Sequence, residues 1–248
     1  MCEVPGRGVT VPKFKRVILK LSGEALLPPD SKYGISLDVA HGIAQEIASV
    51  VQKGVQVGVV IGAGNIFRGS PASSGGMDRT TADNMGMLAT VINSLALQDA
   101  LIKENVPTRV LTAFPIHQMA EPFSQRAAMR SLSEGSTIIF AGGTGNPYFT
   151  TDTAAALRAL EVHADIVCKG TKVDGVYDAD PVKSSKATRF QKLTHMDVIR
   201  KKLEVMDLTA ISMCMDAKLP LLVFNIFRKG NFLKAVMGEE IGTVVYAE

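Results

Sequence analysis

The sequence predicts an α/β fold in which a mainly parallel central sheet lies between two layers of helices, a three-layer αβα sandwich. Residues 55–61 and 137–140 form continuous apolar runs, which are typical of strands covered on both faces. Glycine-rich turns follow these runs and lead on to helical patterns, an order that links parallel strands through crossovers. Ligands of such sheets bind at the carboxyl ends of the strands, so we expect the functional site there.

The composition indicates one globular domain over residues 1–248. Hydrophobic residues make up 46% of the chain and charged residues 21%, and the length allows a sizeable core. No apolar run approaches the ~18 residues that span a bilayer. The first 16 residues contain no apolar segment of the kind found in secretory signals. We therefore expect a cytoplasmic protein.

Charge and cysteine content argue against several classes of function. The net charge of +3 is mild and tryptophan is absent, so a nucleic-acid groove is not indicated. The three cysteines, Cys2, Cys168 and Cys214, show no C-x-x-C spacing, and the four histidines show no H-E-x-x-H arrangement. This pattern predicts neither a disulfide framework nor a metal site built from the protein's own side chains.

The first strand is expected over residues 16–21, and the residues that follow it are Ser22 and Gly23. Lys20 lies at the mouth of this strand, where its ammonium group can meet a phosphate. A strand-end lysine that simply reaches solvent gives the same pattern. This motif therefore needs support from elsewhere in the chain.

A helix and a second strand come next. Apolar residues recur at three- and four-residue spacing from Ser36 to Gly54, which ends the helix. The strand at 55–61 leads into a glycine turn at residues 62–65. The third glycine of a Rossmann fingerprint would fall at Phe67, and no Walker A motif occurs. A nucleotide would therefore bind here by another scheme.

A long helix is expected over residues 80–104. Asp83 is placed in its first turn, where a carboxylate compensates the helix dipole or meets a ligand. The length and an apolar stripe suggest a subunit interface as well as a core. The apolar residues of this helix are Met85, Leu88, Val91, Ile92, Leu95 and Ile102.

The glycine-rich loop at residues 141–151 follows a strand at 106–112, a helix at 124–134 and the apolar run at 137–140. It enters a helix for which Asp152 is the expected N-cap. A strand, a glycine-rich loop and a helix N-terminus together form an anion site. An ordinary connection is the alternative, but three threonine hydroxyls, an amide and a carboxylate are more polar chemistry than a connection needs.

The second half of the chain repeats the strand and turn pattern. Residues 173–176, Val-Asp-Gly-Val, are typical of a turn or hairpin. The other elements are expected as a strand at 164–168, a helix at 203–218, a strand at 221–226 and an edge strand at 244–246.

The run from Thr144 to Asp152 resembles the nucleoside-monophosphate loop of bacterial-type UMP kinases, which belong to the amino acid kinase family. Three further segments resemble the same family in the same order: the motif at 20–23, the glycine turn at 62–65 with Arg68, and residues 169–181. The resemblance covers nearly the whole chain from residue 15. It implies the amino acid kinase fold, with a UMP-binding half at about residues 14–160 and an ATP-binding half at 161–248.

The resemblance implies two nucleotide sites. Asp83 would accept hydrogen bonds from the ribose hydroxyls of UMP. Many relatives have glycine in place of Ala63, where the backbone approaches UMP, and the methyl group of Ala63 is small enough to leave that backbone contact intact. UMP is expected to contact Ala63, Asp83, Thr144, Gly145, Asn146, Pro147, Tyr148, Phe149, Thr150 and Thr151. ATP is expected to contact Lys20, Leu21, Ser22, Gly23, Gly64, Arg68, Thr171, Tyr177 and Asp180.

The resemblance also implies the reaction, a reversible transfer of the γ-phosphoryl group of ATP to UMP in pyrimidine nucleotide biosynthesis. The catalytic residues would be Lys20, which neutralises charge on the transferred group, and Asp152, which orients the lysines. Lys169 and Lys172 would lie near the donor phosphates. Asp152 is not expected to act as a base because the phosphate oxygen of UMP is already ionised. Mg²⁺ would enter as MgATP.

Relatives of this kind imply a homohexamer, with GTP as activator and UTP as inhibitor, and Arg109 lies where some of them have an effector-contacting arginine. Two alternatives remain open. One is another amino acid kinase that phosphorylates a carboxylate or a carbamate, although the loop from Thr144 to Thr151 and Asp83 suit a phosphate and a ribose. The other is a nucleotide or oxyanion binder without activity, although Lys20 and Asp152 favour an enzyme.

Overall fold

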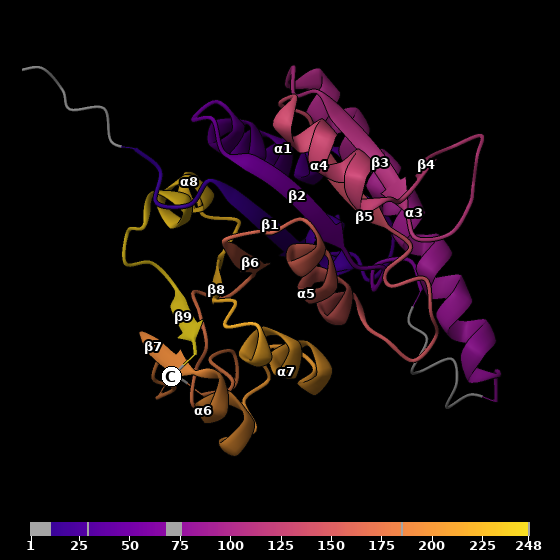
Figure 1. Cartoon of the computed structure of the whole chain (residues 1–248). Coiled ribbons are helices and arrows are strands. Elements are labelled where there is room, and N and C mark those ends of the chain that lie inside the picture. Colours follow the sequence, from indigo (N-terminus) through magenta and orange to yellow (C-terminus); the bar gives the residue numbers. More distant parts are fainter. Residues whose placement is uncertain (1–10, 29, 68–75, 185, 248) are drawn as a thin grey trace, which may run out of the picture.

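The computed structural model describes residues 11–28, 30–67, 76–184 and 186–247. The strands described there form one sheet in the order β4-β3-β5-β2-β1-β6-β8-β9-β7 (Figure 1). All of its pairs are parallel except β8 with β9. The strands are β1 (Arg16–Leu21), β2 (Gln56–Ile61), β3 (Thr108–Thr112), β4 (Glu121–Pro122), β5 (Thr137–Ala141), β6 (Ile166–Thr171), β7 (Lys192–Thr194), β8 (Leu221–Asn225) and β9 (Thr243–Tyr246).

Helices cover both faces of the sheet. They are the 3-10 helix η1 (Gly23–Leu26) and the α-helices α1 (Leu37–Val51), α3 (Arg79–Lys103), α4 (Gln125–Ser133), α5 (Thr151–Glu161), α6 (His195–Arg200), α7 (Leu208–Asp216) and α8 (Asn231–Met237). One apolar cluster joins α1, α3 and α8 to the sheet, and a second joins α4, α5, α6 and α7 to it. Along β1, Val17, Leu19 and Leu21 belong to the first cluster and Ile18 to the second. The predicted three-layer fold is confirmed.

The arrangement of α3 differs from that of an ordinary core helix. Its N-terminal part extends beyond the sheet, toward the lower right of Figure 1. Of the apolar residues predicted on this helix, Val91 is buried, Leu95 is half-buried, and Met85, Leu88, Ile92 and Ile102 are exposed. By length and hydropathy α3 resembles a membrane span, but it packs against α1 and the sheet through buried residues such as Leu97 and Leu101.

Two of the predicted elements are wrong in part. The helix expected at 203–218 begins only at Leu208, because Asp207 caps it and residues 203–205 take an irregular path. The strand expected at the sheet edge near the C-terminus is β9, and it lies inside the sheet because β7 pairs with its outer side. The short elements η1, β4, β7, α6 and α8 have no counterpart in the prediction.

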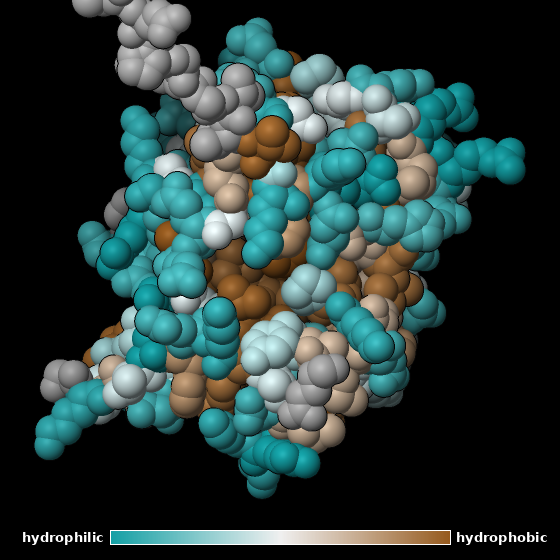
Figure 2. Space-filling view, turned by 60° about the vertical axis from the view of Figure 1, so that its left-hand side comes forward, coloured by the Kyte–Doolittle hydropathy of each residue, from teal (hydrophilic) through white to brown (hydrophobic). Residues whose placement is uncertain are grey.

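The surface is hydrophilic over most of the face that Figure 2 shows, with apolar side chains gathered in a hollow at its centre. A cavity of about 370 Å³ between α1 and the N-terminal end of α8 has a mainly apolar lining. The titratable side chains discussed below lie elsewhere, where the central strands end.

Candidate active site

The carboxyl ends of four neighbouring strands bring the predicted site residues together. The strands β5, β2, β1 and β6 are adjacent and parallel, so their last residues lie along the same edge of the sheet. Lys20 pairs in register with Val60 of β2 and Lys169 of β6. The fold therefore places the two lysines side by side at the centre of this edge.

A buried cluster of three charges occupies that position. The ammonium nitrogen of Lys20 lies 2.6 Å from Oδ1 of Asp152, and that of Lys169 lies 3.1 Å from Oδ2. The side chains of Lys20, Asp152 and Lys169 are only 7%, 14% and 17% exposed. Lys169 also donates a hydrogen bond to the carbonyl of Val205. One carboxylate thus fixes two ammonium groups, and the cluster carries one net positive charge.

The electrostatics of the cluster follow from its burial. Burial alone would raise the pKa of Asp152, but the charges of Lys20 and Lys169 outweigh it and hold the pKa below its usual value. The pKa of Lys169 is lowered, first by burial and further by Lys20, with Asp152 opposing both effects. A carboxylate that stays ionised between two cations suits the positioning of lysines and does not suit proton abstraction.

The start of α5 explains how Asp152 becomes free to pair with lysines. The N-cap is Thr150, whose hydroxyl accepts hydrogen bonds from the backbone N–H groups of Asp152 and Thr153. The prediction of Asp152 as N-cap is therefore wrong. Because Thr150 satisfies these N–H groups, the carboxylate of Asp152 in the first turn can turn toward the strand ends.

Thr151, the residue before Asp152, lines a cavity of about 140 Å³, called here the acceptor cavity. It lies between α3 and the loop that follows β5. Of the residues predicted to contact UMP, it is lined by Ala63, Asp83, Thr144, Asn146, Phe149, Thr150 and Thr151. Gly145, Pro147 and Tyr148 belong to the same loop but do not line the cavity.

Asp83 and the loop are already in contact. The Oδ2 atom of Asp83 accepts a hydrogen bond of 2.8 Å from the backbone N–H of Tyr148 and another of 2.8 Å from Nε of Arg79. Tyr148 adopts a left-handed backbone with φ of 72°, which is uncommon for a residue other than glycine. Since Asp78 caps α3, Asp83 lies beyond the first turn, and the prediction that placed it there is wrong.

The two short glycine motifs pack backbone to backbone. A Cβ atom on Gly23 would lie 2.5 Å from the nitrogen of Gly64 and 2.7 Å from the carbonyl carbon of Ala63, so no side chain fits there. Ser22 and Gly23 follow β1 directly. Leu21 is fully buried, so only its backbone can approach a ligand.

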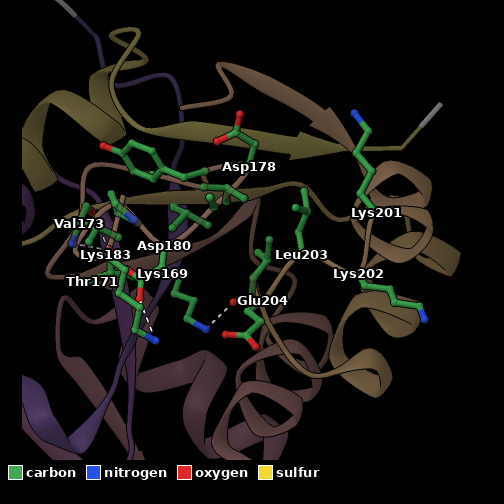
Figure 3. A pocket seen from close by; sticks show the side chains of 17 residues that line it. Lys169, Thr171, Val173, Asp178, Asp180, Lys183, Lys201, Lys202, Leu203 and Glu204 are labelled. Atoms are coloured by element: carbon green, nitrogen blue, oxygen red, sulfur yellow. Dashed lines mark hydrogen bonds and ion pairs between the residues drawn. The ribbon is translucent and has the colours of Figure 1, made fainter. Parts of the chain in front are cut away.

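Lys169 of the cluster lines a second cavity, of about 630 Å³, called here the donor cavity (Figure 3). Thr171, Tyr177 and Asp180 line it, as predicted for ATP contacts, whereas Lys20 and the residues at 21–23 and Gly64 do not. Figure 3 shows Lys169 between Thr171 and Glu204. Arg68 lies outside the described residues.

The segment predicted as a turn or hairpin at 173–176 contains neither a hydrogen-bonded turn nor a hairpin, and residues 173–175 form bends. In the described residues of this region, the antiparallel pairing consists of a single bridge between Tyr177 and Arg189. The opposite wall of the donor cavity comes from residues 201–205, which the resemblance did not assign to the site. Lys172, expected near the donor phosphates, does not line this cavity.

Asp207 is a polar residue of the site that the sequence prediction missed. It caps α7, and its Oδ2 atom accepts hydrogen bonds from the hydroxyls of Thr150 and Thr153 at the start of α5. The donors lie more than 50 residues earlier in the sequence. An Asp that precedes a helix is a recognisable cap signal, but its second set of partners cannot be read from local sequence.

Within the described part of the chain, no group of three or more His, Cys, Asp or Glu side chains is placed to hold a metal ion. The carboxylate of Asp152 in the charged cluster is already paired with two lysines. A divalent cation would have to arrive with its own anionic ligands, such as phosphate oxygens.

Comparisons with known proteins agree with the geometry. The model of the amino acid kinase family matches residues 15–225. The structure is similar to that of a UMP kinase from Bacillus anthracis, with a TM-score of 0.90 and 40% identity over 94% of this chain and 96% of that one. A UMP kinase from Ureaplasma parvum matches with a TM-score of 0.86 and 38% identity, over 94% and 98% of the two chains. A uridylate kinase from Archaeoglobus fulgidus gives 0.69 and 29%, over 92% and 99%.

Proposed function

The chain belongs to the amino acid kinase family, and from this membership we propose that it is a UMP kinase, which transfers the γ-phosphoryl group of ATP to UMP. One observation carries the proposal. The buried cluster of Lys20, Asp152 and Lys169 adjoins two cavities, because Lys169 lines the donor cavity and Asp152 directly follows Thr151 of the acceptor cavity.

The two substrates approach the cluster from opposite sides. UMP occupies the acceptor cavity, where Asp83 accepts hydrogen bonds from the ribose hydroxyls and the residues at 144–151 surround the nucleotide. ATP occupies the donor cavity, with its base and ribose near Thr171, Tyr177 and Asp180. Its phosphates extend toward Lys20 and the backbone of residues 21–23 and 64, and Arg68 also contacts ATP.

The chemical step then needs alignment and charge neutralisation. An ionised oxygen of the UMP phosphate attacks the γ-phosphorus, the bond from that phosphorus to the β,γ-bridging oxygen breaks, and ADP leaves with the electron pair. No base is needed because the nucleophile carries no proton. Lys20 and Lys169 stabilise negative charge on the migrating group, and Asp152 holds both ammonium groups in place.

Mg²⁺ would be held by the phosphates of ATP. This suits the donor cavity, where Asp178, Asp180 and Glu204 supply scattered carboxylates without a closed ligand set. When bound, the ion would supply additional charge neutralisation. Cytoplasmic location and a role in the synthesis of UTP and CTP follow from the same proposed activity.

Assembly and control form a further part of the proposal. The exposed apolar residues of α3 suit contacts between subunits of a homohexamer, with GTP as activator and UTP as inhibitor. Arg109, at the position of an effector-contacting arginine, is paired with Glu121 and donates to the hydroxyl of Ser131. An effector anion would have to compete with Glu121 for this guanidinium group.

The test is a coupled assay of ADP release with UMP, CMP, glutamate and aspartate as acceptors, with and without GTP. We expect turnover with UMP far above that with the other acceptors, because the loop and Asp83 fit a ribose phosphate. Turnover with glutamate or aspartate would identify another amino acid kinase. Binding of UMP without turnover would identify a nucleotide binder.

A further inference from the structure

Helix α3 carries three buried polar side chains, Thr90, Asn93 and Ser94, to which the proposed mechanism assigns no role. They are 2%, 0% and 0% exposed. A buried polar group is unfavourable unless it is hydrogen-bonded, so the partner of each side chain indicates what that side chain does. Two of the three have partners in the loops beside the acceptor cavity.

Asn93 holds the glycine turn that follows β2. Its amide group donates hydrogen bonds of 2.7 Å to the carbonyl of Gly62 and 2.7 Å to Oδ1 of Asn65. The amide of Asn65 donates in return to Oδ1 of Asn93, at 2.9 Å, and to the carbonyl of Gly34, at 3.0 Å. Both amides are fully buried, and all four of their N–H bonds are used.

Thr90 holds the loop that follows β5. Its hydroxyl accepts a hydrogen bond of 2.8 Å from the backbone N–H of Gly142 and donates to the carbonyl of Met87 at 2.7 Å. Gly142 has a φ of 78°, and a Cβ atom there would lie 2.7 Å from the ring of Phe114. The loop therefore leaves the strand along a path that depends on glycine and on Thr90.

Ser94 differs from its two neighbours. Its hydroxyl donates to the carbonyl of Thr90, within the same helix, at 2.7 Å. It is as buried as Asn93 but contacts neither loop through this bond. Ser94 thus offers a matched control for the loss of a buried polar group from α3.

We infer that Thr90 and Asn93 are positioning residues of the phosphoryl transfer. Thr90 positions the loop that follows β5, and Asn93 positions the glycine turn at residues 62–65, between the proposed sites of the two phosphate groups. The inference rests on the proposed function. The side chains lie one turn apart on a single rigid helix, so the two loops keep a fixed separation. Errors of about 1 Å in such alignment cost as much as ~100-fold in rate.

The experiment measures kcat and both KM values for the full-length wild type and for Thr90→Val, Asn93→Asp and Ser94→Ala, below the melting temperature of every variant. Thr90→Val keeps the shape but removes the acceptor, and we expect it to raise KM for UMP about fivefold or more with little change in KM for ATP. Asn93→Asp keeps the shape but removes two donors, and we expect kcat to fall about tenfold or more with both KM values raised. Ser94→Ala should lower the melting temperature only.

Unchanged KM values and unchanged kcat per folded molecule in Thr90→Val and Asn93→Asp would show a purely structural role and overturn the inference. If Asn93→Asp does not fold, Asn93→Ser, which buries no charge, is measured in its place with the same expectation. Absence of UMP turnover by the wild type would overturn the proposed function instead. Calorimetric titration of wild type and Thr90→Val with UMP then decides the inference, since equal affinities or no binding would contradict it.

Discussion

At the scale of single residues, the arrangement of charge at the sheet edge depends on Asp152. Its two oxygens contact two different lysines, which come from β1 and β6. Two buried ammonium groups would otherwise repel each other across the space where the phosphates are proposed to meet. With Asp152 in place, the cluster keeps one net positive charge, which attracts and stabilises a phosphoryl group.

Replacing Lys20 tests its role in transfer directly. We expect Lys20→Ala to lower turnover with UMP by about 100-fold or more, because a preorganised cation at the migrating group is lost. The circular dichroism spectrum should change little. Lys15→Ala is the control, since the side chain of Lys15 is exposed and lies just before the start of β1, whereas Lys20 lies near its end. Lys20→Ala enzyme that phosphorylates UMP at the wild-type rate would disprove the assignment.

The lowered pKa of Asp152 predicts a pH-dependent contribution to stability. The folded-state pKa lies below the unfolded value of about 3.9, so the ionised group stabilises the fold above that value. The contribution is lost as the pH falls through the folded pKa. We expect Asp152→Asn to lower the urea midpoint at pH 7 and the difference from wild type to shrink below about pH 4. A difference that stays constant from pH 7 to pH 3 would contradict this explanation.

At the scale of secondary-structure elements, the adjoining ends of α5 and α7 are held together by Asp207. The same carboxylate caps α7 through the N–H of Ala210 and accepts hydrogen bonds from Thr150 and Thr153 of α5. Thr150 in turn caps α5, the helix that presents Asp152. The position of the charged cluster therefore depends on how these two helices meet.

Loss of Asp207 should cost more than loss of an ordinary cap. We expect Asp207→Ala to lower the free energy of unfolding by about 2–3 kcal/mol, the sum of a cap and two hydrogen bonds. Asp78→Ala is the matched control, because Asp78 caps α3 and, among the residues that the structure describes, its side chain bonds to Thr81 of the same helix. That change should cost about 1 kcal/mol. Equal losses in urea unfolding would show that the bonds between the helices contribute nothing.

At the scale of the whole molecule, helix α3 has one buried side and one exposed apolar side. Its buried side contacts the sheet and both loops of the site, while Met85, Leu88 and Ile92 form an exposed apolar stripe at three- and four-residue spacing. Apolar side chains that share one helix face in this way suit contact with another protein surface. In the proposed homohexamer this stripe contacts a second copy of the chain.

A charge in the stripe should weaken that assembly. We expect Ile92→Glu to shift the protein toward smaller species in sedimentation velocity, because the glutamate would be buried without a partner at the interface. Val182→Glu is the control, since Val182 is 85% exposed and lies in a loop outside α3. A wild-type protein that sediments as a monomer would refute the proposed assembly.

Local patterns in the sequence carry much of the fold. The buried strands were predicted to within a few residues, because a strand covered on both faces must be apolar throughout. Helix α1 was predicted from its period, which the structure confirms, and the structure adds Ser36 as its N-cap. The position of β9 inside the sheet was not predictable. It depends on β7, which has three residues and pairs with a partner about 50 residues away.

The candidate site, like the fold, was predicted from the sequence only in part. The sequence by itself determined which residue types follow each strand, since glycine, lysine and hydroxyl residues at those positions are constrained by local backbone geometry and by chemistry. Only the tertiary structure decided the contacts of Asp152 with Lys20 and Lys169, of Asp207 with α5, and of Asn93 with the glycine turn. These contacts join residues far apart in the chain, and they form only when parallel strands and their helices have packed into one sheet edge.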